Sequence, residues 1–184
     1  MVKLDKIYTR GGDGGRTSLG DGKRVVKHDP NVTALGAIDE ANAAIGLVRL
    51  HVKGDAGAML GRIQNDLFDL GADLAAPLGS KPDALRVTQK QVERLEAEID
   101  AMNAGLPPLD SFVLPGGSES CAFLHLARAV TRRAEGLICK LADGGAVNPV
   151  ALRYANRLSD HLFVLSRSLN EGGEEQTWEP GGNA

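Results

Sequence analysis

The sequence is poor in aromatic side chains and in cysteine, and both shortages narrow the class of protein. Aromatic residues make up 4% of the 184 residues, while alanine, leucine and glycine are abundant, a balance that favours closely packed helices over a β-sheet. The two cysteines, Cys121 and Cys139, lie in one segment with helical periodicity. In a helix they would be about 27 Å apart, at a rise of about 1.5 Å per residue, too far to form a disulfide with each other. We therefore expect a protein of a reducing compartment.

The chain also lacks long apolar runs and an excess of positive charge. No run approaches the length of a membrane span, and the first residues do not contain the apolar core of a secretory signal. The formal net charge of −3 provides no general attraction for nucleic acid. We expect a cytoplasmic protein of one domain that binds neither membranes nor nucleic acid.

Metal ligands and an activated nucleophile are missing as well. The four histidines show no HxxxH, HExxH or ExxH spacing, so we predict no metal held by protein side chains. A magnesium ion held mainly by the phosphates of a nucleotide stays compatible with the sequence. Cys121 belongs to no pattern that would supply a histidine and an acid, so nucleophilic catalysis by the protein is not expected.

Five amphipathic segments fill most of the chain. Apolar residues recur in them at spacings of three and four, over about residues 30–50, 60–74, 88–102, 118–142 and 149–169, with a turn at residues 54–57. Helix-start signals precede four of them: Asp29-Pro30, Thr88 with Gln91, Ser118, and Asn148-Pro149. The predicted fold is all-α, a five-helix bundle of the ferritin-like up-down type over residues 29–170. Residues 1–28 are a glycine-rich leader of the same domain, and residues 171–184 a loose, flexible C-terminal tail.

The leader contains a dense glycine run, TRGGDGGRTS, at residues 9–18. It does not match the GxxxxGK[ST] phosphate loop and does not follow a strand of a βαβ unit, so neither nucleotide fingerprint applies. Consecutive glycines nevertheless let backbone amides converge on an anion, and further donors are available from Arg10, Arg16, Thr17, Ser18 and Lys27. A flexible terminus explains the run equally well.

The segment over residues 118–142 carries two stripes on nearly opposite sides of its predicted helix. The apolar stripe comprises Phe123, Ala127, Val130, Ala134, Leu137 and Leu141. The polar stripe comprises Cys121, His125, Arg128, Arg132 and Glu135. Its charges can pair with phosphate, or they can form a solvated, salt-bridged outer face. Asp39 and Glu40 on the first predicted helix are carboxylates in an apolar neighbourhood, where a buried acid would need a partner such as an arginine. Asn156 and Asp160 lie one turn apart on the last predicted helix, and all four residues can instead be polar residues of the surface.

Four stretches, in this order, resemble the PduO-type ATP:cob(I)alamin adenosyltransferases: TRGGDGGRTSL, LGAIDEANAAIG, FVLPGGSESCAFLHLARAVTRRAE and YANRLSDHLFVLSR. The resemblance covers nearly the whole chain apart from the tail. It implies a five-helix bundle that assembles as a homotrimer with active sites between adjacent subunits. It also implies transfer of the 5′-deoxyadenosyl group of ATP to the cobalt of cob(I)alamin, which gives adenosylcobalamin and triphosphate.

The resemblance assigns roles to individual residues. Arg128 would pair with Asp39 across the subunit interface, and Phe112 would press on the lower face of the corrin; with Arg132 these form the expected catalytic set. Nucleotide contacts would come from Thr9, Arg10, Gly11, Gly12, Thr17, Ser18, Lys27, Arg132, Arg133, Glu135 and Asn156. ATP would bring Mg²⁺, and the implied partners are a flavoprotein reductase and an adenosylcobalamin-dependent mutase.

The residue chemistry agrees with that reaction. Cob(I)alamin is itself a strong nucleophile, so the protein needs only to orient the 5′ carbon and neutralise the leaving triphosphate. An apolar ring that displaces the lower axial base leaves a four-coordinate cobalt that is easier to reduce, and Phe112 stands just before a Leu-Pro-Gly-Gly turn. The alternatives are a non-catalytic ATP- or corrinoid-binding carrier or regulator, and a structural bundle with a basic face. A mere ATP sensor would not need Phe112, Arg128 and Asp39, and a structural bundle would not need the leader.

Overall fold

Five helices and one short hairpin are the regular elements of residues 6–80, 82–145, 147–170 and 175–182, the part of the chain that the computed structural model describes. The hairpin consists of β1 (Arg16–Ser18) and β2 (Arg24–Val26). The helices are α1 (Pro30–His51), α2 (Gly54–Ala75), α3 (Gln89–Asn103), α4 (Glu119–Ala142) and α5 (Pro149–Ser168). The predicted five-helix fold is therefore confirmed, with a small antiparallel strand pair added to it. Among the described helices, none is long and apolar enough to cross a lipid bilayer.

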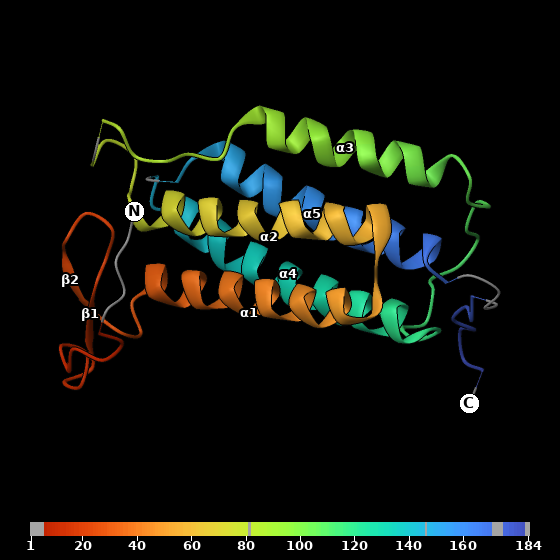
Figure 1. Cartoon of the computed structure of the whole chain (residues 1–184), viewed down its shortest axis with the longest axis horizontal. Coiled ribbons are helices and arrows are strands. Elements are labelled where there is room, and N and C mark those ends of the chain that lie inside the picture. Colours follow the sequence, from red (N-terminus) through yellow and green to blue (C-terminus); the bar gives the residue numbers. More distant parts are fainter. Residues whose placement is uncertain (1–5, 81, 146, 171–174, 183–184) are drawn as a thin grey trace.

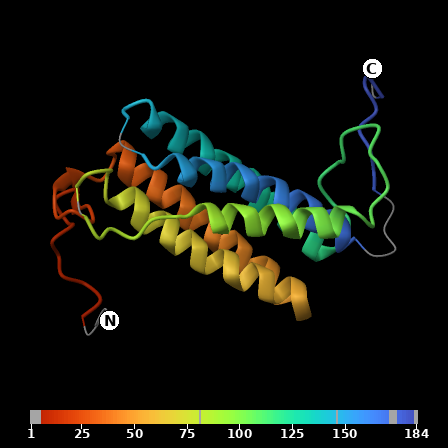
Figure 2. The same cartoon turned by 90° about the horizontal axis from the view of Figure 1, so that it is seen from above.

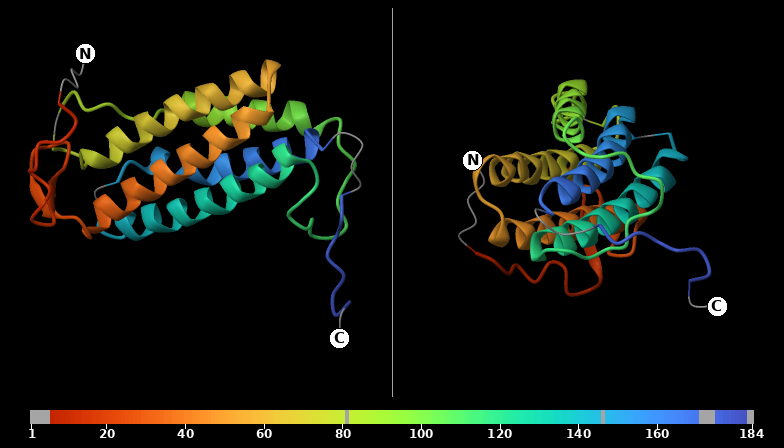
Figure 3. Two further views of the ribbon diagram at one scale, coloured as in Figure 1. Left: turned by 60° about the horizontal axis from the view of Figure 1, so that its bottom comes forward. Right: turned by 90° about the vertical axis from the view of Figure 1, so that its right-hand side faces the viewer.

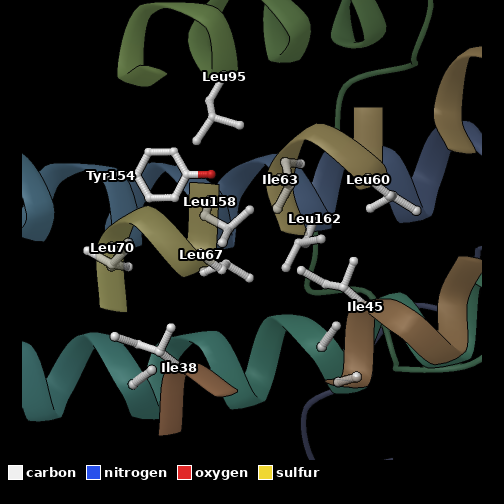
Figure 4. Packing of buried hydrophobic residues seen from close by; sticks show 14 of the residues in the cluster. Ile38, Ile45, Leu60, Ile63, Leu67, Leu70, Leu95, Tyr154, Leu158 and Leu162 are labelled. Atoms are coloured by element: carbon white, nitrogen blue, oxygen red, sulfur yellow. The ribbon is translucent and has the colours of Figure 1, made fainter. Parts of the chain in front are cut away.

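The helices form a bundle in which each one runs opposite to the helix before it (Figure 1). α4 packs against both α1 and α5, α2 packs against α1, and α3 packs against α5. Between them lies a core of fully buried side chains that includes Ile45, Leu60, Ile63 and Leu162 (Figure 4). The phenol of Tyr154 is buried in the same core.

Side chains cap the N-termini of the helices at the positions that the sequence predicts. Asp29 in front of α1, Ser118 in front of α4 and Asn148 in front of α5 each accept a hydrogen bond from an amide of the first turn. Before α3, the side chain of Gln91 accepts from the amide of Thr88 at 2.8 Å. These bonds satisfy donors that the helix itself leaves without partners.

One helix boundary was predicted wrongly. The sequence suggests a turn at residues 54–57, but α2 already begins at Gly54. The reversal takes only Val52 and Lys53, because Gly54 adopts a φ of +61°, a conformation that glycine tolerates best. Asp55 then lies in the first turn of α2, where a negative charge is favourable.

The leader folds into the β1–β2 hairpin, which the sequence analysis did not predict. The hairpin lies at the end of the bundle where α1 begins (Figure 1). Leu19 and Val25 are buried, and the amide of Gly20 donates to the carbonyl of Ala75 in the last turn of α2 at 3.0 Å. Strands of three residues are too short to show an alternating pattern, so the only sequence signal was the Asp-Gly dipeptide that ends at Gly22.

The buried face of α4 differs from the predicted apolar stripe. Ala127 and Ala134 are buried as expected, but Phe123 and Leu137 are only half-buried. The other buried residues of α4 are Cys121, Leu124, His125, Thr131 and Ile138. Because α4 packs on α1 on one side and on α5 on the other, its buried surface is wider than one stripe and takes in part of the polar stripe.

Candidate functional site

A large cavity lies where the α3–α4 loop and the C-terminal segment meet α4 and α5. Its volume is about 680 Å³. Phe112 and Trp178 line it on the loop side, and their ring centroids are 6.1 Å apart. Arg128 and Arg132 line it from α4. The cavity therefore offers apolar rings at one side and positive charge at the other, which suits a large, partly apolar ligand together with an anionic one.

The loop that carries Phe112 is held by the C-terminal segment. Val113 and Thr177 form an isolated antiparallel bridge. The amide of Trp178 donates to the carbonyl of Phe112 at 2.7 Å, and the amide of Leu114 donates to the carbonyl of Gln176 at 2.8 Å. We expected the whole tail to be loose, but its described residues, 175–182, make these contacts beside the α3–α4 loop (Figure 2). Phe112 itself remains 77% exposed, so its ring faces outward from a fixed backbone.

Glycine fixes the turn from this loop into α4. Gly117 has a φ of +90°, and a Cβ there would lie 2.4 Å from Asn170 Oδ1. The same Asn170 oxygen accepts from the amide of Ser118 at 3.2 Å. Any side chain at Gly117 would collide with this oxygen, so the glycine in the Leu-Pro-Gly-Gly turn keeps the loop close to α5.

Arg128 is only partly satisfied within the described residues. Its guanidinium lies 5.8 Å from the ring of Phe163, and its Nε is buried without a hydrogen-bond partner there. Burial, followed by the neighbouring charge of Arg132, lowers the pKa of Arg128. Both effects disfavour the charged form, so an anion or carboxylate placed against Arg128 would relieve them.

Three residues of α4 and α5 that were expected to contact the nucleotide have partners on neighbouring helices: Arg133, Glu135 and Asn156. Arg133 on α4 forms an ion pair with Glu40 on α1. Asn156 on α5 donates from Nδ2 to Glu135 Oε1 on α4 at 2.7 Å. These contacts fix side chains on three neighbouring helices. The expectation of a carboxylate in an apolar neighbourhood at Asp39 and Glu40 was wrong, because both are exposed.

The leader brings its expected phosphate donors close together. A Cβ on Gly12 would lie 3.2 Å from Lys27 Nζ, so the lysine side chain passes directly over this glycine. The amide of Lys27 donates to the carbonyl of Gly15 at 2.9 Å. Arg10 has a φ of +59°, unusual for a residue with a side chain. Thr9, Gly11, Thr17 and Ser18 belong to the same small region and are exposed or half-buried.

Arg24 holds the leader in this shape, a role that sequence reasoning missed. Its guanidinium donates to the carbonyl of Gly11 at 2.6 Å and to the hydroxyl of Ser18 at 3.4 Å. It thus joins β2 to the glycine run. The pattern RVVK contains nothing that distinguishes this arginine from an ordinary surface residue, so only the hairpin geometry identifies it.

Three cavity residues were also missed or undervalued. Phe163 lines the cavity one turn after Asp160 on α5, and the sequence analysis did not single it out. Ser159 lies beside them and is buried. Trp178 is the one tryptophan of the chain and stands in a polar tail, which was a compositional signal that the sequence analysis did not use.

The expected site residues fall into two groups that a single chain does not bring together. The leader lies at the end where α1 begins, and the α3–α4 loop with Phe112 lies at the other end (Figures 1 and 3). The 22 residues of α1 separate these ends by about 33 Å at a rise of about 1.5 Å per residue. One ATP molecule cannot contact both the leader and the ring of Phe112 in the same chain.

Asp39 stands apart from both groups. It is exposed on α1 and lines a groove of about 330 Å³ between α1 and α2, next to Phe68, which is 70% exposed. Within the described residues Asp39 forms no ion pair, and Arg128 lines the other cavity, from the neighbouring helix α4. The expected Arg128–Asp39 pair is therefore not an intrachain contact of the described residues.

The buried polar side chains near the loop do not form an activated nucleophile. Burial raises the pKa of the Cys121 thiol, which keeps it protonated near neutral pH. Burial, and then the charge of Arg128, lowers the pKa of His125 and keeps this imidazole neutral. Over the described ranges no three His, Cys, Asp or Glu side chains gather as a metal site would require.

Comparison with known proteins identifies the family. The family model described as cobalamin adenosyltransferase matches residues 7–169. A corrinoid adenosyltransferase from Mycobacterium bovis is 49% identical over 188 residues, which cover 99% of this chain and 97% of the relative. A cobalamin adenosyltransferase from Cupriavidus metallidurans is 44% identical over 181 residues, covering 96% of each chain.

The fold agrees with the same family. A solved structure of a variant PduO-type ATP:corrinoid adenosyltransferase from Lactobacillus reuteri, complexed with cobalamin and ATP, superposes with a TM-score of 0.88. Its sequence is 34% identical, and the match covers 94% of this chain and 99% of that one. The resemblance that the four sequence stretches suggested is confirmed, and the chain belongs to the cobalamin adenosyltransferase family.

Proposed function

We propose that this protein transfers the 5′-deoxyadenosyl group of ATP to the cobalt of cob(I)alamin. The electron pair of cobalt attacks C5′, the cobalt–carbon bond forms as the C5′–oxygen bond breaks, and triphosphate leaves with the bonding electrons. The observation that carries the proposal is the cavity of about 680 Å³ that places the Phe112 ring opposite Arg128 and Arg132. Membership of the family and a relative solved with cobalamin and ATP support it.

The residues of the cavity fit a reaction in which the substrate is the nucleophile. The protein then has to orient the two substrates and compensate the charge of the leaving triphosphate. Arg132 is exposed at the cavity and forms no ion pair within the described residues, so its charge is available for a phosphate. The raised pKa of Cys121 is consistent with a mechanism that uses no protein thiolate.

Phe112 is proposed to cover the lower face of the corrin. A ring that displaces the lower axial base leaves cobalt four-coordinate, and its reduction from cob(II)alamin becomes easier. The backbone of Phe112 is held by Trp178 while its side chain is 77% exposed, which suits a ring that presses on a ligand. A flavoprotein reductase that supplies the electron and a mutase that uses the product are the partners proposed with this role.

The active site is proposed to form between adjacent subunits of a homotrimer. The leader and the Phe112 loop lie at opposite ends of one chain, so a site that brings ATP on the leader to a corrin on Phe112 requires two chains. Arg128 has a buried Nε without a described partner, and Asp39 is an exposed carboxylate, so these two side chains suit a contact across the interface.

ATP is proposed to bind through the leader of one subunit and the α4–α5 face of its neighbour. The proposed contacts are Thr9, Arg10, Gly11, Gly12, Thr17, Ser18, Lys27, Arg132, Arg133, Glu135 and Asn156. Magnesium would be held mainly by the phosphates. The free thiols of Cys121 and Cys139 fit the reducing cytoplasm proposed as the location.

One measurement tests this function directly. Purified protein is mixed with ATP, Mg²⁺ and chemically reduced cobalamin, and the absorbance change of adenosylcobalamin formation is followed over many turnovers. We expect one triphosphate released for each adenosylcobalamin formed, and no change when ATP is omitted. A protein that binds ATP or corrinoid but yields no product would be a carrier or regulator, and the proposed activity would be wrong.

A further inference from the structure

We propose that the ion pair between Arg167 and Glu175 positions Phe112 for the reaction that starts from cob(II)alamin. This inference rests on the proposed function and adds two positioning residues to it. Arg167 lies in the last turn of α5, and Glu175 begins the described part of the C-terminal segment. Neither residue lines the large cavity, so both act through others.

Arg167 joins three parts of the chain. Its Nε donates to Glu175 Oε1 at 2.7 Å, and its NH2 group donates to Glu175 Oε2 at 3.0 Å. The same NH2 group donates to the carbonyl of Pro107 in the α3–α4 loop at 2.8 Å. The arginine thus ties α5, the C-terminal segment and the loop at one point, where the loop and the segment lie side by side in two views (Figures 2 and 3).

The pair is nearly excluded from solvent. The Arg167 side chain is 5% exposed and that of Glu175 is 21% exposed. Two charge-assisted bonds in fork geometry fix both position and direction of the carboxylate, which a surface ion pair would not do. Glu175 is therefore a fixed starting point for the residues that follow it.

The residues after Glu175 reach Phe112 directly. The carbonyl of Gln176 accepts from Leu114, and the amide of Trp178 donates to Phe112, so this short strand pairs on both sides of Val113. The hydroxyl of Ser111 also donates to the carbonyl of Trp178 at 2.8 Å. A shift of Glu175 would move the strand, and with it the backbone of Phe112.

The space beneath the loop makes such a shift possible. A small cavity of about 140 Å³ lies between the loop and the bundle, and Gly116, Cys121, His125 and Glu175 are among its lining residues. At this cavity the loop is not supported by close packing, so the position of Phe112 depends on the strand and its ion pair as well as on the Gly117 turn. Without the pair, we expect Phe112 to sample positions from which it no longer displaces the lower base.

The test uses full-length Glu175→Gln, Arg167→Met and the double variant. Glutamine keeps the size of Glu175 but removes its charge. The readout is the fraction of bound cob(II)alamin in the four-coordinate form in the presence of ATP, measured by electron paramagnetic resonance, together with kcat and KM from cob(II)alamin with reduced flavin and from cob(I)alamin. We expect Glu175→Gln to lower the four-coordinate fraction about tenfold, and the double variant to be no worse than Arg167→Met, because the two residues act as one unit.

Controls separate a positioning role from a loss of fold. Glu96→Gln removes one partner of a more exposed ion pair with Arg157, between α3 and α5 and away from the loop, and should leave the four-coordinate fraction as in wild type. Arg167→Lys keeps the charge but cannot bond both Glu175 oxygens and Pro107 in the same way. Its four-coordinate fraction should therefore lie between those of Arg167→Met and wild type. ATP affinity should change less than twofold in Glu175→Gln, since neither Glu175 nor Arg167 lines the cavity that contains Arg132.

Two results would overturn the inference. One is a wild-type four-coordinate fraction in Glu175→Gln. The other is an equal loss of the rates from cob(I)alamin and cob(II)alamin together with a lower melting temperature, which would indicate a structural role only. A wild-type protein that does not adenosylate cob(I)alamin would instead refute the proposed function, so the two failures are distinguishable.

Discussion

At the scale of single residues, Arg132 is the sharpest test of charge compensation. Its side chain is exposed at the cavity, so replacing it should change the melting temperature little. If its charge stabilises the departing triphosphate, Arg132→Ala should lower kcat from cob(I)alamin by at least about 100-fold. Arg132→Lys keeps the charge without the fork geometry, so its kcat should lie between those of wild type and Arg132→Ala. Activity within twofold of wild type in Arg132→Ala would remove Arg132 from the proposed site.

Phe112 tests the axial-displacement step. Because the ring is 77% exposed, Phe112→Ala should cost little folding stability. It should reduce the rate from cob(II)alamin about tenfold or more while reducing the rate from cob(I)alamin by a smaller factor, since only the first reaction needs the four-coordinate state. The ratio of the two rates, measured with the same protein sample, gives the answer. An unchanged ratio would mean that Phe112 only binds the corrin.

The sequence predicted the residues whose chemistry is unusual and missed those whose role depends on pairing. Phe112, Arg128 and Arg132 were named, and all three line one cavity. Arg24 and Trp178 were not, because the first acts through a hairpin and the second through a bridge between segments far apart in the chain. Such contacts produce no local periodicity in the sequence, so the residues that make them cannot be identified from spacing alone.

At the scale of elements, helices were predictable and their buried faces less so. Capping side chains and apolar spacing located four helix starts, whereas the start of α2 depended on the positive φ of Gly54. The face of α4 was misjudged because two neighbours cover it. Spacing along one helix says which residues share a side, but only the neighbouring helices decide how much of that side is buried.

Asp73 is the element-scale test, because it joins α2 to the linker and to α5. It is 1% exposed and accepts from Arg86 at 2.6 Å, from the amide of Val87 at 2.8 Å and from Asn148 at 2.7 Å. Asp73→Ala leaves these donors without their partner and should lower the free energy of unfolding by about 3–5 kcal/mol, measured by urea denaturation. Removing the exposed Asp100 on α3 by the same substitution should cost less than about 0.5 kcal/mol. Equal losses in the two variants would contradict the role given to the buried carboxylate.

At the scale of the whole molecule, the proposed pairing of Arg128 with Asp39 can be tested through the assembly of the chains. Asp39→Arg would place two positive charges at the proposed interface and should shift the trimer toward smaller species in analytical ultracentrifugation. Combining it with Arg128→Asp reverses the pair and should restore the trimer. Activity should not return, because Arg128 also lines the cavity. A trimer that tolerates Asp39→Arg alone would show that this pair does not hold the interface.

The separation of the leader from the Phe112 loop gives the most discriminating prediction about the assembled protein. Lys27→Ala disables the leader, and Arg132→Ala disables the α4 face, so each variant alone should be nearly inactive. If the sites form as proposed, each site of a mixed trimer combines the leader of one chain with the α4 face of the next, and random assembly leaves about one site in four with both parts intact. Refolding the two variants together should therefore recover about a quarter of wild-type activity. If one chain supplied a complete site, mixing would recover nothing, and the leader would have to reach its own cavity over the length of α1.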